Sequence, residues 1–279
     1  MNLPAPGAPF ITSIFHPSDF SKASELAFAH ALAIALISQT ELVIMHAGGG
    51  HLDGWSQFPH VRETLERWQV LPPGSPRSAV FDKLAVKIVK ISAPGDPVEA
   101  SVEHIEKRQP DLIVLATRGH HGLPQWLKPS IAQAIARRTE AMTLFVPRDC
   151  RGIVSLDGVI SLRRVLIPVD RQPNAQEAIV RAVRVVEAFA DSPVEIVLLH
   201  VGDGEFPQYE RPASELCTWQ ELRRQGDPAA AILAAADKQT DLIIMATEGH
   251  HGFVDAIRGS VTEQVVYGAD CPVLAVPSK

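Results

Sequence analysis

The feature that most constrains the fold is a segment that occurs twice along the chain. Residues 241–276 read DLIIMATEGHHGFVDAIRGSVTEQVVYGADCPVLAV, and residues 111–146 read DLIVLATRGHHGLPQWLKPSIAQAIARRTEAMTLFV. Asp111 and Asp241 open the two copies, and matching residues lie 130 positions apart (241 − 111). A repeat of this length at a constant offset indicates an internal duplication, so the chain should contain two units of one architecture.

The second copy predicts a buried strand, a glycine-rich loop, a helix and a final strand. Gly249 and Gly252 flank the two histidines of the loop, and Gly259 precedes Ser260, which has the capping-box spacing to Glu263. Glycines let a backbone approach a ligand closely, and a helix N-terminus presents unpaired N–H groups, so phosphate can bind here. The alternative is that the glycines recur by chance and Ser260 only caps its helix.

The first copy predicts a weaker site of the same kind. Gly119, Gly122 and Ser130 repeat the pattern, but Pro129 stands where the second copy has Gly259. Proline has no N–H group and cannot adopt a positive φ. We therefore expect the first copy to keep its helix cap and to lose part of its anion-binding loop.

Strands and helices alternate along both halves with short connections, which indicates parallel sheets with helices on both faces. Before the first repeat, strands are predicted at 10–16, 41–46 and 85–91, and helices at 21–38, at 58–69 and after Asp96-Pro97. In the second half, strands are predicted at 164–169 and 195–201, and helices at 174–190 and after Asp227-Pro228. From the histidine that ends the second strand to the Gly-Asp-Pro turn, the second half is shorter by about 23 residues. This difference is large enough for the second half to lack a counterpart of the helix at 58–69. Ligands of such sheets bind at the carboxyl ends of the strands.

The junction between the halves has a hairpin pattern. Asp157-Gly158 lies between β-prone segments, which is typical of a tight turn between two strands. We therefore divide the chain into a first domain at 1–148, a hairpin-like connector at 149–163, and a second domain at 164–279 that lacks one helix.

Composition excludes several classes of protein. The net charge of −6 and the pI near 6.0 argue against nucleic acid as the main partner. No apolar stretch is long enough to span a bilayer, and the N-terminus lacks the pattern of a signal peptide, so no membrane partner is expected. Three widely spaced cysteines favour a reducing compartment, and we expect a cytoplasmic protein.

Two aspartates are candidates for ligand binding. Asp19 and Asp170 each follow the first strand of a half, at the edge where a carboxylate can accept a hydrogen bond from a ribose hydroxyl or a base amine. The alternative is a loop aspartate that caps the following turn. The paired histidines lack the four ligands of a structural zinc site, so no metal site is predicted. His46 and His200, which end the second strands, are interpreted as structural residues.

No constellation of catalytic residues is evident. The chain contains no nucleophile with a neighbouring base and no phosphate-binding loop with a lysine, which weakens any hypothesis of fast phosphoryl transfer. We therefore favour a binding protein over an enzyme and predict no catalytic residues.

Taken together, these motifs resemble the universal stress protein family in its tandem two-domain form. The resemblance rests on the strand ends Pro168-Val169-Asp170 and His200-Val201, the Gly226-Asp227-Pro228 turn, the glycine loop, and residues 271–277, with weaker counterparts in the first half. It implies two Rossmann-like (adenine nucleotide alpha-hydrolase-like) α/β domains, each with a five-stranded parallel sheet. It also implies that the last strands, 143–146 and 273–276, pair as in a dimer, within this one chain, with a further homodimer as an option.

The resemblance also implies a nucleotide site for ATP or AMP, with Mg²⁺ as the one metal that could accompany the nucleotide. Asp170 and Val201 would contact adenosine, while the glycine loop would contact ribose and phosphates. The site so predicted comprises Pro168, Asp170, Val201, Gly249, Gly252, Gly259, Ser260, Val261 and Thr262, and the weaker first site comprises Asp19, Gly119, Gly122 and Ser130.

One departure from the family pattern concerns the loop. Residues 253–258 provide six positions between Gly252 and Gly259, where the nucleotide-binding pattern has about nine, so the loop would hold the phosphates differently or would hold fewer of them. Three functions follow from the sequence. The chain is a stress-response sensor or adaptor that binds adenine nucleotide and unidentified protein partners; or a slow ATPase that phosphorylates itself at Ser260, Thr262 or a loop histidine; or an interaction module that binds no nucleotide.

Overall fold

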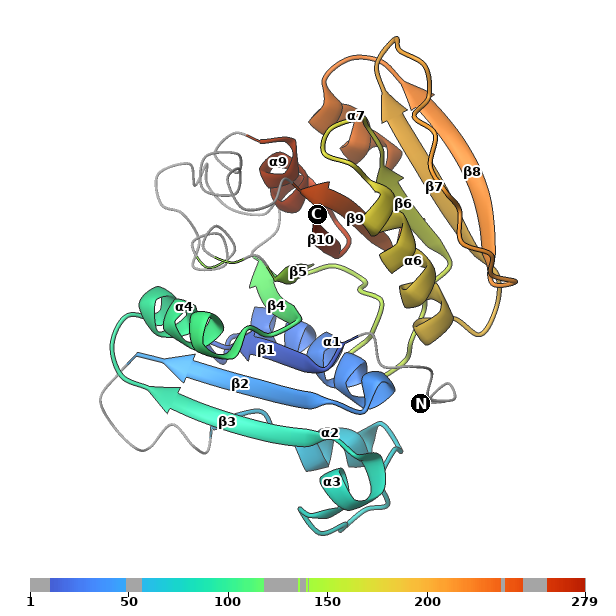
Figure 1. Ribbon diagram of the computed structural model, residues 1–279. Helices are drawn as coiled ribbons and strands as arrows, with labels where there is room; N and C mark the ends of the chain where they lie inside the picture. The colour runs from blue at the N-terminus through green and yellow to red at the C-terminus, as the bar shows by residue number, and fades with distance from the viewer. Residues whose placement is uncertain are drawn as a thin grey trace.

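The computed structural model describes residues 11–48, 57–117, 135, 139, 141–236, 239–247 and 260–278. Strands and helices alternate in both halves (Figure 1). The elements of the first half are β1 (Ser13–Pro17), α1 (Lys22–Ser38), β2 (Glu41–Ala47), α2 (Val61–Arg67), α3 (Ala79–Leu84), β3 (Lys87–Ala93), α4 (Pro97–Arg108), β4 (Leu112–Thr117) and β5 (Met142–Pro147). Those of the second are β6 (Arg164–Pro168), α6 (Gln176–Phe189), β7 (Val194–Val201), β8 (Cys217–Arg224), α7 (Pro228–Ala235), β9 (Leu242–Thr247), α9 (Val261–Gly268) and β10 (Val273–Pro277).

All ten strands form one sheet in the order β3-β2-β1-β4-β5-β10-β9-β6-β7-β8. Within each half the strands run parallel, as the alternation of elements predicts. The halves meet where β5 pairs with β10 in the antiparallel sense, with Leu144 opposite Leu274. The expected pairing of the two last strands within one chain is therefore observed, and the α/β fold class is confirmed.

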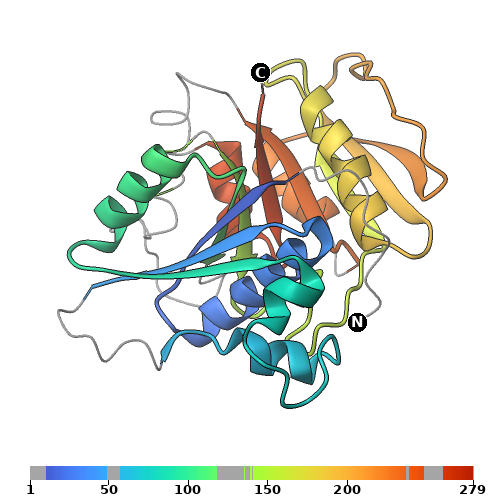
Figure 2. The same ribbon diagram turned by 60° about the horizontal axis from the view of Figure 1, so that its bottom comes forward.

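Helices cover both faces of the sheet (Figure 2). On β1, Ile14 belongs to a core shared with α1 and α6, whereas its neighbour Phe15 belongs to a second core shared with α4, α7 and α9. The alternation arises because successive side chains of a strand point to opposite faces. Each core contains residues of both halves, so the apolar layers run across the junction.

Side-chain caps begin the helices where the sequence predicts them. Asp96 accepts hydrogen bonds from the N–H groups of Val98 (2.9 Å) and Glu99 (3.0 Å), and Pro97 occupies the first turn of α4. Asp227 caps α7 in the same way through the N–H of Ala230 (2.8 Å). These caps satisfy N–H groups that have no partner within the helix.

The segment between β2 and β3 differs from the prediction. One helix was expected at 58–69, but the structure has a shorter α2 (Val61–Arg67) and a second helix, α3 (Ala79–Leu84). The second helix was missed because its six residues follow a stretch of Pro, Gly and Ser that indicates a loop. In the second half, residues 202–216 contain no helix, so the two halves differ by both short helices.

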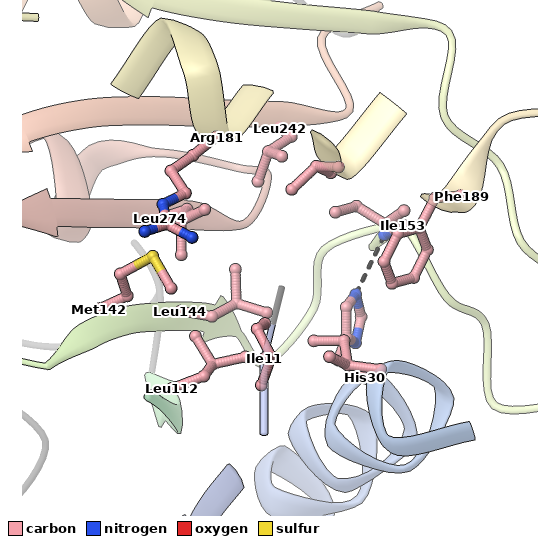
Figure 3. A pocket seen from close by; sticks show the side chains of 12 residues that line it. Ile11, His30, Leu112, Met142, Leu144, Ile153, Arg181, Phe189, Leu242 and Leu274 are labelled. Carbon is pink, nitrogen blue, oxygen red and sulfur yellow. Dashed lines mark hydrogen bonds between the residues drawn. The ribbon is translucent and has the colours of Figure 1, made fainter. Parts of the chain in front are cut away.

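The connector packs against helices of the first half. Val154 and Ile160 form an isolated antiparallel bridge around a turn, and Trp68 Nε1 donates a hydrogen bond to Leu156 O (2.8 Å). His30 of α1 lies beneath the start of the connector, where its Nε2 accepts a hydrogen bond from the N–H of Ile153 (3.0 Å; Figure 3). The division of the chain at residues 149–163 stays a prediction.

Two expectations from composition bear on the fold. The longest apolar stretch belongs to α1, and among the described helices none combines the length and the hydropathy needed to cross a bilayer. Cys150, Cys217 and Cys271 are free thiols. The cytoplasmic location stays a prediction.

Candidate functional site

A cavity of about 330 Å³ lies at the carboxyl ends of β6, β7 and β9. Beyond β6 the chain continues outward through β7 and β8, whereas β9 and β10 lie on the other side of β6. The cavity therefore lies at the point where strand order reverses, which is where open α/β sheets bind ligands. Six predicted site residues line it: Pro168, Asp170, Val201, Ser260, Val261 and Thr262.

Part of the lining of the cavity is apolar. Ile232 of α7 and Met245 of β9 are buried in the core, and Ala246 and Val201 also line the cavity. Such side chains suit the face of a planar ring and offer it no competing hydrogen bond. Asp170, Thr262 and the start of α9 add polar groups, so the cavity has the mixed lining of a small-molecule site.

Asp170 is held at the rim by its own loop. Its Oδ1 accepts a hydrogen bond from the N–H of Arg171 (2.7 Å), and the hydroxyl of Tyr209 donates to its backbone carbonyl. The side chain is exposed and lies just after β6. A carboxylate in this position can accept further hydrogen bonds from a ligand in the cavity.

The N-terminus of α9 faces the same cavity. Ser260 is the N-cap, with φ −68° and ψ 157°, and its Oγ accepts a hydrogen bond from the N–H of Glu263 (3.1 Å). The two intervening residues, Val261 and Thr262, line the cavity and belong to the first turn, where backbone N–H groups have no partner within the helix. These N–H groups and the helix dipole favour an anion at this end of α9.

A buried histidine fixes the strand ends beside the site. His200 Nδ1 donates to Val169 O (3.2 Å), and Val169 N donates to Leu199 O (2.8 Å). In the first half, His46 Nδ1 donates in the same way to Ser18 O (2.8 Å). The two histidines thus tie the second strand to the residue before the aspartate, which agrees with their interpretation as structural residues.

Asp19 has a different environment from Asp170. Its Oδ1 accepts hydrogen bonds from Ser21 N (3.0 Å) and Ser24 Oγ (2.6 Å) at the start of α1. Partial burial raises the pKa of this carboxyl, but the hydrogen bonds from Ser21 and Ser24 outweigh that effect, and the pKa lies below its ordinary value. Ser21 is the N-cap of α1, and Asp19 stabilises the turn that leads into it, which corresponds to the alternative of a loop aspartate that caps the following turn.

Several predicted site residues lie outside the described residues: Gly119, Gly122, Ser130, Gly249, Gly252 and Gly259. The four loop histidines also lie outside them. Within the described ranges, no group of three or more His, Cys, Asp or Glu side chains is arranged to hold a metal ion.

The cavity also contains residues that the sequence did not single out. Thr247 ends β9 immediately before the glycine loop, and its buried Oγ1 has no hydrogen-bond partner among the described residues. Pro228 and Ile232 lie on the first turns of α7, after the Gly-Asp-Pro motif. In the sequence these residues lie beside the glycine loop or the Gly-Asp-Pro motif, which could have drawn attention to them. That β9 and α7 meet at one cavity is evident only from the fold.

Comparisons with known proteins agree with this architecture. The sequence pattern of the universal stress protein family matches residues 12–147 and 210–277. A universal stress protein of Mycobacterium tuberculosis is 24% identical over 293 residues, which cover 92% of this chain and 94% of the relative. The crystal structure of a universal stress protein from Archaeoglobus fulgidus superposes with a TM-score of 0.66 at 19% identity, covering 96% of this chain and 97% of the other. A putative universal stress protein from Pseudomonas aeruginosa superposes with a TM-score of 0.57 at 13% identity, covering 96% and 94%.

Proposed function

This chain belongs to the universal stress protein family in its tandem form, and we propose that its second half binds an adenine nucleotide, ATP or AMP. The observation that carries the proposal is the convergence of Asp170, Val201 and the first turn of α9 on one cavity of about 330 Å³. These residues come from three separate segments of the chain. Each was a candidate on the sequence alone, and a cavity of this size lies within the range of small-molecule sites.

The nucleoside would occupy the part of the cavity near β7 and β9. The adenine ring would pack against Val201 and Met245, which supply apolar contact area. The carboxylate of Asp170 would accept hydrogen bonds from the ribose hydroxyls or the base amine. Since Asp170 donates no hydrogen bond itself, it selects for ligand groups that are donors.

The phosphates would lie at the N-terminus of α9. The backbone N–H groups of Val261 and Thr262 would donate to phosphate oxygens, and the Thr262 hydroxyl would add a further donor. The described part of the cavity has no lysine or arginine in its lining, so backbone groups would provide most of the recognition there. A magnesium ion would enter with the nucleotide, because its phosphate oxygens are the ligands that Mg²⁺ prefers.

The first half is proposed to bind nucleotide weakly or not at all. Asp19 already accepts two hydrogen bonds at Oδ1 near the start of α1, which leaves it less acceptor capacity for a ligand than Asp170 has. Pro129 removes an N–H group from the corresponding loop. The fused protein would therefore have one working site, and its other half would serve the sensor or adaptor role.

Calorimetric titration with ATP, AMP and adenosine tests this proposal. We expect one site on the wild type and at least tenfold weaker binding for Asp170→Ala. Asp19→Ala is the matched control, because it removes the same group from the corresponding position of the first half and should leave the affinity unchanged. Adenosine should bind more weakly than AMP if the start of α9 holds a phosphate.

Two results would contradict the proposal, and a third would change the role assigned to the bound nucleotide. Absence of saturation at millimolar ATP would remove nucleotide binding and favour the interaction module. Two equivalent sites would show that the first half is intact. Phosphate release from ATP that stops with Asp170→Ala would instead indicate the slow ATPase, so it is measured on the same samples.

A further inference from the structure

A groove of about 790 Å³ on the first half is lined by residues of β3, α2 and α3 and of the segments beside them. Figure 1 shows these three elements next to one another. It is built from the two short helices that the second half lacks, since residues 202–216 contain no helix. β3 is the outermost strand of the sheet on this side. The groove is therefore specific to one half and far along the sheet from the proposed nucleotide site, which lies between β6 and β9.

The floor of the groove is apolar. Val61, Val80 and Val86 are buried beneath it, and Ile88 of β3 joins them. Phe81 of α3 lines the groove with 62% of its surface exposed. A large aromatic side chain left exposed beside an apolar floor is typical of a site that receives an apolar group from a partner.

The lining of the groove holds four lysine and arginine residues and one carboxylate, Glu63, so its net charge is positive. Two of its basic residues are paired within the chain: Lys87 Nζ lies 2.5 Å from a Glu41 carboxylate oxygen, and Arg62 Nε lies 3.5 Å from Glu66. Arg77 is exposed and forms no ion pair within the described part of the chain.

Lys90 is the second basic residue of the groove without a salt bridge in the described part of the chain. Its Nζ donates to the carbonyl of Pro59 (2.9 Å) and lies 5.7 Å from the centroid of the Phe58 ring, but it reaches no carboxylate among the described residues. Burial lowers the pKa of Lys90, and the charge of Arg77 lowers it further, while Glu63 opposes this effect. Two like charges are thus held close together in a chain whose net charge is −6.

We propose that this groove docks an extended acidic segment of a partner protein. A carboxylate of the segment would lie between Arg77 and Lys90, and a neighbouring apolar side chain would pack against Phe81 and the valine floor. Charge-assisted hydrogen bonds to arginine and lysine are stronger than neutral ones, which gives the anion its place. The free side of β3 suits a segment in extended conformation.

A protein segment fits the groove better than a nucleic acid. The apolar floor would face a charged sugar-phosphate backbone without matching it, and the acidic chain as a whole would repel a long polyanion. A short acidic peptide places its charges only where Arg77 and Lys90 lie, and its apolar side chains match the floor.

Selection from a random dodecapeptide display library on the full chain tests the proposal. We expect the peptides recovered on the wild type to be enriched in Asp and Glu together with one large apolar residue. Their dissociation constants, measured by fluorescence anisotropy, should rise at least tenfold for Arg77→Glu and for Phe81→Ser. Both residues are exposed, so these variants should fold, and thermal unfolding verifies this.

Arg184→Glu is the matched control, because it makes the same charge change at an exposed position on α6, outside the groove. It should change the dissociation constants less than twofold. Peptides that are neutral or basic, peptides that bind Arg77→Glu equally well, or failure to recover any peptide above background would overturn the proposal. A single-stranded RNA oligonucleotide is titrated in parallel; binding that is lost in Arg77→Glu would assign the groove to nucleic acid instead.

Discussion

Protonation of His30 should detach the connector from the first half. The ring lies inside the protein, where Nδ1 donates to Leu26 O (2.8 Å) and Nε2 accepts from the N–H groups of Ile153 (3.0 Å) and Val154 (3.3 Å). Only the neutral ring can make this set of bonds, because a protonated Nε2 would be a donor facing two donors. Acid should therefore destabilise the fold at this point.

The size of the effect follows from the pKa. Burial lowers the pKa of His30 from 6.5 to about 4, against the opposing effect of the hydrogen bond to Leu26. The contribution of neutral His30 to the free energy of unfolding is fully present above pH 6.5 and decreases as the pH falls toward 4. The reason is that His30 binds a proton in the unfolded chain at pH values where it stays neutral in the folded chain. A difference of 2.5 pKa units (6.5 − 4) corresponds to about 3 kcal/mol. His16, whose pKa burial also lowers to about 4, should add a similar loss.

Urea unfolding at several pH values between 4.5 and 6.5 measures this loss. His30→Gln should be less stable than the wild type at pH 7.5 by about 1–2 kcal/mol, since amide groups replace the ring bonds imperfectly. As the pH decreases, the free energy of unfolding of His30→Gln should fall less steeply than that of the wild type. Near pH 5 the two slopes should differ by about 1 kcal/mol per pH unit. His60→Gln changes the same residue type at an exposed position and is the control. An unchanged slope in His30→Gln would refute the reasoning.

Three further predictions concern the backbone. Gly158→Ala should lower the free energy of unfolding in urea more than Gly74→Ala. Both glycines have φ of +77°, so the backbone strain is the same. At Gly158 the added Cβ would lie 2.4 Å from the Trp68 ring, whereas at Gly74 no described atom lies within 4 Å of it. Asp241→Ala should cost about 2–4 kcal/mol in the same assay, and Asp241→Asn less, since the carboxylate accepts from two N–H groups at 2.7 and 3.0 Å at the start of β6. Asp227→Ala should lower the free energy of unfolding by about 1 kcal/mol in thermal unfolding, because the N–H of Ala230 loses its acceptor at the start of α7. An unchanged stability would contradict a stabilising role of this cap.

Much of the fold could be predicted because local patterns and tertiary structure agree. Short apolar runs such as 242–246 became strands buried on both faces, and Asp96 and Asp227 begin helices where their spacing predicts. The duplication fixed the number of units. The α3 helix escaped prediction because its six residues make fewer than two turns, too few to show a helical period, and they follow a stretch rich in Pro, Gly and Ser.

The candidate site was predictable only in part. Asp170 and Ser260 carry motifs that can be read along the chain, but Thr247 and Ile232 enter the cavity because distant strands and helices meet there. The different roles of Asp19 and Asp170 also depend on neighbours. Asp19 accepts hydrogen bonds from Ser21 and Ser24 at the start of α1, whereas Asp170 accepts one from the backbone N–H of Arg171.

The antiparallel seam between β5 and β10 has a consequence for independence of the two halves. A seam between separate chains forms and dissociates with dilution, whereas here the connector holds the partner strands at an effective concentration on the order of millimolar. The seam therefore persists however dilute the protein is. In a symmetric dimer of identical chains, each substitution would also appear in both subunits, but in this chain one half can change alone. Pro129 and the helices α2 and α3 are differences of that kind, because each is present in one half only.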